Sequence, residues 1–109
     1  MKSLSKEQLT THKDLKFLAK EEKKIEVKII SLMQKAESCN LALAMGFKNL
    51  TEYCKIELGL SESRSYKRYQ AMRVLRDFPE FNEIFVSGKT HVSTLATIGP
   101  KLTRQNSQT

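Results

Sequence analysis

Apolar residues recur at intervals of three and four along most of this chain. In the stretch "EEKKIEVKIISLMQKAESC", Ile25, Ile29, Leu32, Met33 and Ala36 follow this spacing, and Lys and Glu fill most of the positions between them. Such spacing places apolar side chains on one face of an α-helix. No stretch shows a convincing strand alternation, and only four Gly and two Pro interrupt the chain. We therefore predict an all-α fold of five or six short helices.

The length of 109 residues is enough for about one small domain. We expect a single helical domain over residues 1–109, with an N-terminal helical segment at 5–38 and a core at 41–103. The pattern Ser5-x-x-Gln8 can form a capping box, which predicts where the first helix begins. The spacing leaves open whether the N-terminal segment is one long helix or two.

Residues typical of helix ends divide the core region. Asn49 is expected to cap a helix over 50–58, with Glu52 completing a capping box. Ser61 is expected to cap the next helix, because its hydroxyl can accept a hydrogen bond from a backbone N–H one turn in. That helix should end near Phe78, because Pro79 disfavours helical geometry in the residue before it. Glycines at 46, 59 and 88 are expected to end the helices before them.

Two short helices are expected after Pro79. The first, in "PEFNEIFVSG", should turn Phe81, Ile84 and Phe85 inward. The second lies in "THVSTLATI", and Thr103 is a possible cap beyond it.

Nothing in the chain points to catalysis or to a membrane. No stretch approaches the ~18 apolar residues of a membrane span, and the first residues lack the apolar run of a secretion signal, so we expect a cytoplasmic protein. Cys39 and Cys54 are isolated and are expected to be small core residues rather than a disulfide. His12 and His91 have no companion at metal spacing. We predict no enzyme activity, no metal and no cofactor.

Basic charge is concentrated in one predicted helix. The net charge is +7, and residues 61–76 contain five Lys and Arg against the single acid Glu62. A local concentration of this kind is the electrostatic footprint of a phosphate-binding surface. It is equally the composition of a basic, well-solvated helix, so charge alone does not choose between a nucleic-acid surface and a solvent-facing one.

The order of elements around Gly59 adds to the charge. A helix over 50–58, a turn at 59–61 and a helix from Glu62 follow the grammar of a helix-turn-helix. Lys55 departs from the usual pattern, because a small residue usually lets the two helices approach there. Ser65 and Arg68 also depart from it, at positions where the second helix usually packs with apolar side chains.

A helical wheel separates the faces of this second helix. Ser65, Tyr69, Met72 and Leu75 share the arc that should face the core. Tyr66 is expected to pack against the preceding helix, and Arg73 and Arg76 can pair with Asp77 or Glu80. The N-terminal residues of a recognition helix are the ones that reach bases or phosphates. The candidate nucleic-acid-binding residues are therefore Ser61, Ser63, Arg64, Lys67 and Arg68.

The region from Leu41 to Thr103 resembles the helical N-terminal domain of bacterial HNH endonuclease-like proteins. The matching pieces are "GF", the helix "L-x-x-YC", "ELGLSES", "SYKRYQAMRVLRDFPE", and Gly88 followed by "TLATIGPKLT". Residues 57–98 also look like the helix-turn-helix region of ParB-type partition proteins. In the first family an HNH nuclease domain with a metal site follows this region, and no such site remains here. The resemblance therefore implies the binding part and not the nuclease, in a short protein or in a fragment of a longer one.

Two functions follow as expectations. The first is a non-catalytic DNA-binding domain that contacts the phosphate backbone through residues 59–76. The second is a helical protein-interaction or oligomerisation module, such as a homodimer, with no nucleic-acid role. An uncovered basic start of the helix after Ser61 would favour DNA, whereas an apolar stripe left exposed over residues 25–36 would favour the interaction module.

Overall fold

The structure is a computed structural model that describes residues 3–102, and this part of the chain is all-α. It contains six α-helices and two 3-10 helices, and it has no strand within the described range. The helices are α1 (Lys6–Ser38), α2 (Leu41–Ala44), α3 (Leu50–Ile56), α4 (Glu62–Asp77), η1 (Pro79–Phe81), α5 (Asn82–Val86), α6 (Val92–Ile98) and η2 (Gly99–Lys101). The predicted fold class is confirmed, and the cap predicted at Thr103 lies outside the described residues.

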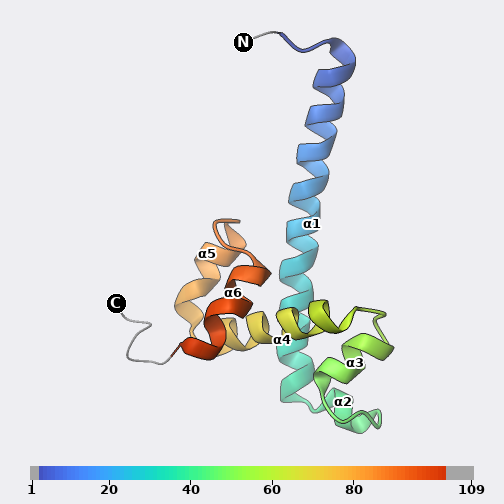
Figure 1. Cartoon of the computed structure of the whole chain (residues 1–109), viewed down its shortest axis with the longest axis vertical. Helices are drawn as coiled ribbons and strands as arrows, with labels where there is room; N and C mark the ends of the chain where they lie inside the picture. The colour runs from blue at the N-terminus through green and yellow to red at the C-terminus, as the bar shows by residue number, and fades with distance from the viewer. Residues whose placement is uncertain (1–2, 103–109) are drawn as a thin grey trace.

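The N-terminal segment is a single helix of 33 residues. Ser5 begins it with the predicted capping box: its hydroxyl accepts from the N–H of Gln8, and the Gln8 side chain accepts from the N–H of Ser5. The first half of α1 projects away from the other helices (Figure 1), and every residue from 3 to 20 is exposed. Only the second half of α1 therefore takes part in the core.

Helix α4 is the centre of the fold. Helix α1 crosses it, α3 lies beside its first half, and α6 packs along its second half (Figure 1). Ala71 and Met72 of α4 are fully buried. On the helices around α4, Cys54, Phe85 and Leu95 are at most 1% exposed. Removing this apolar surface from water is the main favourable contribution to folding.

A lysine fixes α1 to the C-terminal helices. The Nζ atom of Lys23 lies 3.7 Å from the centre of the Phe85 ring, and it donates to the carbonyl of Thr90 at 3.3 Å and to Glu26 at 3.3 Å. A cation over a ring face is attracted by the negative charge of that face, and more strongly where water is excluded. Lys23 therefore links α1 to α5 and to the loop before α6.

The helix ends and turns of the core are mostly as predicted. Gly46, Gly59 and Gly88 all have positive φ, and α4 ends at Asp77, just before Phe78 and Pro79. Helix α3 is shorter than expected and ends at Ile56. Asn49 caps it by accepting from the N–H of Glu52, but the capping box is not closed, because the Glu52 carboxylate accepts from Lys48 instead.

Three burial predictions were wrong. Cys39 is exposed, because it follows the last turn of α1 where the chain leaves the core, whereas Cys54 is buried as expected. Ile84 is exposed on the outer face of α5, although Phe85 beside it is buried. Tyr66 is 48% exposed rather than packed in the core, because it lies on the outer face of α4.

None of the helices in residues 3–102 combines the length and the apolar character needed to cross a membrane.

Candidate nucleic-acid interface

A tight turn determines where α4 begins. Gly59 has φ +68°, a conformation that glycine adopts without the steric cost of a Cβ atom. The next residue, Leu60, donates its N–H to the carbonyl of Cys54 at 3.2 Å and so ties the turn back to α3. Ser61 then caps α4, because its hydroxyl oxygen accepts from the N–H of Arg64 at 3.1 Å. The predicted cap and turn are confirmed.

The core-facing arc of α4 is also as predicted. Ser65, Met72 and Leu75 are buried, and Tyr69 is half-buried, with its hydroxyl donating to the carboxylate of Glu37 on α1 at 3.3 Å. Burial raises the pKa of Tyr69 above its ordinary value, and the negative charge of Glu37 adds to this rise. Because this arc faces the core, the opposite side of α4 faces solvent.

The five candidate residues lie together at the start of α4. Ser61, Ser63, Arg64 and Lys67 are exposed, whereas Arg68 is half-buried. Arg68 is on the α3 side of the helix, where it acts on a buried thiol. Burial raises the pKa of Cys54, and the nearby positive charge of Arg68 offsets part of that rise. Four of the five candidates are therefore exposed to solvent, and Arg68 is only partly exposed.

The basic residues of the two halves of α4 differ in their partners. In the second half, the Arg73 guanidinium lies 5.9 Å from the centre of the Tyr69 ring, and Arg76 pairs with Asp77 at 2.9 Å. The hydrogen bond to Asp77 is the main reason why the pKa of Arg76 is raised. In the first half, the side chains of Arg64, Lys67 and Arg68 form no ion pair or hydrogen bond with any residue of the described chain.

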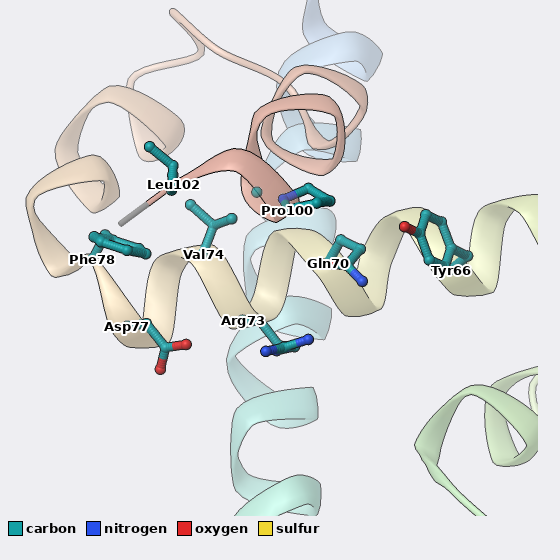
Figure 2. Close-up of a pocket in the computed structure, with 9 residues that line it drawn as sticks. Tyr66, Gln70, Arg73, Val74, Asp77, Phe78, Pro100 and Leu102 are labelled. Atoms are coloured by element: carbon teal, nitrogen blue, oxygen red, sulfur yellow. The ribbon is translucent and has the colours of Figure 1, made fainter. Parts of the chain in front are cut away.

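A hollow lies beside the second half of α4 (Figure 2). It has a volume of about 720 Å³ and is open to solvent between α4 and η2. Val74 of α4 and Phe78, the residue just after α4, line it across from Pro100 and Leu102, and Arg73 and Asp77 of α4 also line it. Tyr66 and Gln70 extend this lining toward the first half of α4. Sequence reasoning missed this hollow, because only the fold brings residues 99–102 against α4.

The described residues contain no cluster of side chains suited to bind a metal ion. Among residues 3–102, no group of three or more His, Cys, Asp and Glu side chains is close enough to hold a metal ion. His12 lies on the exposed first half of α1, and His91 lies just before α6.

The second surface of interest is the outer side of α1. Ile25 and Leu32 are exposed, and Ile29 and Ala36 are half-buried, so an apolar stripe runs over residues 25–36. Toward its C-terminal end this stripe enters a mostly apolar groove of about 480 Å³. The groove is lined by Ile29, Leu32, Ala36, Leu41, Tyr53 and Leu58, among others. The exposed basic start of α4, which is expected of a DNA-binding surface, is therefore present. So is the exposed apolar stripe on α1, which is expected of an interaction surface.

Comparisons with protein-family models, with curated proteins and with solved structures find no match to this chain.

Proposed function

We propose that this chain is a non-catalytic DNA-binding domain that contacts the phosphate backbone through residues 59–76. The observation that carries this proposal is the difference between the two halves of α4. Arg73 and Arg76 are engaged within the protein, whereas Arg64, Lys67 and Arg68 are left without partners around an uncovered helix start. Charges that serve only to solvate a helix have no reason to gather at its N-terminal end, where cations are disfavoured by the helix dipole.

Each candidate residue has a role in this proposal. Arg64, Lys67 and Arg68 supply positive charge to phosphates or to base edges, and contacts to phosphate provide most of the affinity. Ser61 and Ser63 can donate hydroxyl hydrogen bonds to phosphate oxygens. The free backbone N–H groups of the first turn of α4 also favour an anion. Together these donors form an anion-binding start to the helix.

The order of elements also supports DNA binding. Helix α3, the Gly59 turn and helix α4 follow one another as in a helix-turn-helix, with α4 in the place of the recognition helix. The resemblance of residues 41–103 to the helical domain of HNH endonuclease-like proteins agrees with a binding role without nuclease chemistry. DNA binding also agrees with the expected cytoplasmic location.

A titration against salt tests this function. The full chain is titrated into a labelled random-sequence DNA duplex, and binding is followed by fluorescence anisotropy at several salt concentrations. The logarithm of the affinity should fall linearly with the logarithm of salt, with a slope of about −0.9 for each phosphate contact. Three contacts predict a slope of roughly −3. A chain that shows no binding even at low salt would refute the proposal.

The alternative function is a helical interaction or oligomerisation module with no nucleic-acid role. The exposed apolar stripe on α1 favours it, because contiguous exposed apolar surface marks interaction sites. If the titration finds no DNA binding, this alternative is the better account of the molecule. The apolar stripe on α1 and the proposed DNA contact share no residue, so one chain can have both functions.

A further inference from the structure

The outer side of α1 carries a longer pattern than the stripe over residues 25–36. Positions 15, 18, 22, 25, 29, 32 and 36 are separated by alternating steps of three and four residues. They are occupied by Leu15, Leu18, Glu22, Ile25, Ile29, Leu32 and Ala36. This is the spacing of the a and d positions of a coiled coil, in which one helix packs along another. We call these seven residues the α1 seam.

The α1 seam is distinct from the face of α1 that packs in the core. Ile30 and Met33 are buried in that core, whereas Leu15, Leu18, Ile25 and Leu32 of the seam are between 56% and 65% exposed. Every residue from 3 to 20 is exposed, so nothing in the described chain covers the first half of the helix. A helical extension of about 15 residues is only marginally stable in water without packing. The first half of α1 therefore needs a partner.

We propose that the partner is a second copy of this chain, and that the two α1 helices pack antiparallel with their centre near Lys20. Charge along one side of the seam carries this choice. The flanking positions hold Glu7, Asp14, Glu21, Lys28 and Lys35, which are acidic toward the N-terminus and basic toward the C-terminus. An antiparallel partner brings each acidic end beside a basic one.

The pairing is self-complementary under a two-fold axis. Glu7 of one copy lies opposite Lys35 of the other, and Asp14 lies opposite Lys28. In the described part of the chain, none of these four side chains has an ion-pair partner. The two Glu21 side chains meet at the two-fold axis, where each is paired with Lys24 of its own helix at 3.2 Å. In the same arrangement Leu15 of one copy packs beside Ile25 of the other, while Ile29 and Leu32 come level with Thr11 and Gln8 of the other copy.

The end of the partner helix also meets an apolar surface in this register. Leu4 lies two residues before α1 and is 53% exposed. In the antiparallel pair it comes level with Ala36 of the other copy. Ala36 lines the groove formed with Leu41 and Leu58, so this groove faces the residues that lead into the partner's α1.

A parallel pair is disfavoured by the same residues. It would place Glu22 of one copy against Glu22 of the other within the apolar seam. Burying two like charges together is strongly unfavourable, whereas the antiparallel pair places Glu22 beside Leu18, from where its carboxylate can reach solvent.

This inference does not rest on the proposed DNA contact, because the α1 seam and the start of α4 share no residue. If both hold, one dimer presents two copies of α4. Loss of self-association would then leave the salt-dependent contact of each chain in place, so failure of one proposal is distinguishable from failure of the other.

The first test compares two adjacent residues of similar exposure. Leu18 lies on the seam and is 59% exposed, while Phe17 lies off it and is 61% exposed. Sedimentation equilibrium of the full chain should show a dimer, and Leu18→Ser should weaken dimerisation by roughly tenfold or more, because each copy loses the apolar surface that Leu18 buries in the seam. Phe17→Ser should leave the dimer unchanged. A monomeric parent, or equal effects of the two variants, would overturn the proposal.

Charge reversal tests the orientation. Asp14→Lys and Lys28→Asp should each weaken self-association, by about tenfold, because two attractive pairs per dimer become repulsive. An equal mixture of the two variants should dimerise as well as the parent, since each chain then meets the opposite charge on the other. These residues are exposed, so neither variant should lose its fold. A mixture that associates no better than the separate variants would exclude the antiparallel register.

Discussion

Gly99 lies so close to Val74 that no side chain fits between them. A Cβ atom on Gly99 would lie 2.8 Å from Cγ2 of Val74, which is itself only 3% exposed. This contact brings the end of α6 onto the second half of α4.

Gly99→Ala should lower the free energy of unfolding by about 1–2 kcal/mol. Val74 is a short, stiff side chain in a packed core, so relieving the overlap requires α6 to shift. Denaturant unfolding measures the effect. The double variant with Val74→Ala should show a non-additive cost, because the methyl group that causes the overlap is gone. Strictly additive costs would show that the close contact is not the cause.

Ser65→Ala should raise stability. Ser65 is fully buried, and its hydroxyl oxygen has no hydrogen-bond partner within the described structure. Removing an unpaired buried hydroxyl should gain about 1 kcal/mol, beyond the ~0.5 kcal/mol that alanine gains over serine in a helix. The exposed Ser63→Ala measures the second part alone. A thermal midpoint for Ser65→Ala below that of the parent would contradict this account of the α4 core face.

Lys23→Met should destabilise the protein by about 1–2 kcal/mol, through loss of the contact with the Phe85 ring and of the bond to the Thr90 carbonyl. The Lys23 side chain is only 18% exposed, so the methionine keeps its apolar stem but not its charge. Lys24 is the matched control, because its side chain is 70% exposed and pairs only with Glu21. Lys24→Met should change the unfolding free energy by less than about 0.5 kcal/mol. Equal effects of the two substitutions would show that the contacts of Lys23 with Phe85 and Thr90 do not stabilise the fold.

The two cysteines should differ sharply in reactivity toward a chromogenic disulfide reagent. Cys39 is exposed, whereas Cys54 is fully buried and its pKa is raised by that burial, so little reactive thiolate forms there. One thiol per folded chain should react quickly, and the second only when denaturant unfolds the protein. Cys39→Ser should abolish the fast phase. Two fast thiols in the folded parent would contradict the burial of Cys54.

Local rules predicted the parts of the fold that depend on neighbouring residues. The caps at Ser5 and Ser61 and the end of α4 before Pro79 each follow from interactions within one helical turn. The core arc of α4 was also predicted correctly, because Ser65, Met72 and Leu75 keep helical spacing.

Predictions that needed tertiary contacts were less reliable. Cys39 and Tyr66 were expected inside, but which face of a helix is covered depends on where the other helices pack. The spacing also could not separate the two apolar sides of α1, since Met33 faces the core and Leu32 beside it faces solvent. For the candidate site, the sequence placed the basic residues on α4 and predicted that Arg76 could pair with Asp77 or Glu80, and the structure pairs it with Asp77. The sequence could not show that Arg64 has no ion-pair partner among the described residues.

The central claim is that phosphate is contacted by the first half of α4 and not by basic charge in general. Two double variants that remove the same charge from the two halves of this helix test it most directly. Arg64→Ala with Lys67→Ala removes the exposed pair of the first half, and Arg73→Ala with Arg76→Ala removes the pair of the second half. Both lower the net charge by two, so a purely electrostatic attraction to DNA would weaken equally in both.

The measurement is the slope of log affinity against log salt for a random-sequence duplex, with thermal unfolding as the check on folding. The Arg64→Ala, Lys67→Ala variant should flatten the slope by roughly two units, one for each lost phosphate contact. The Arg73→Ala, Arg76→Ala variant should keep the slope of the parent. Equal slopes for the two variants, or a parental slope in the first, would contradict the assignment of the DNA contact to the start of α4.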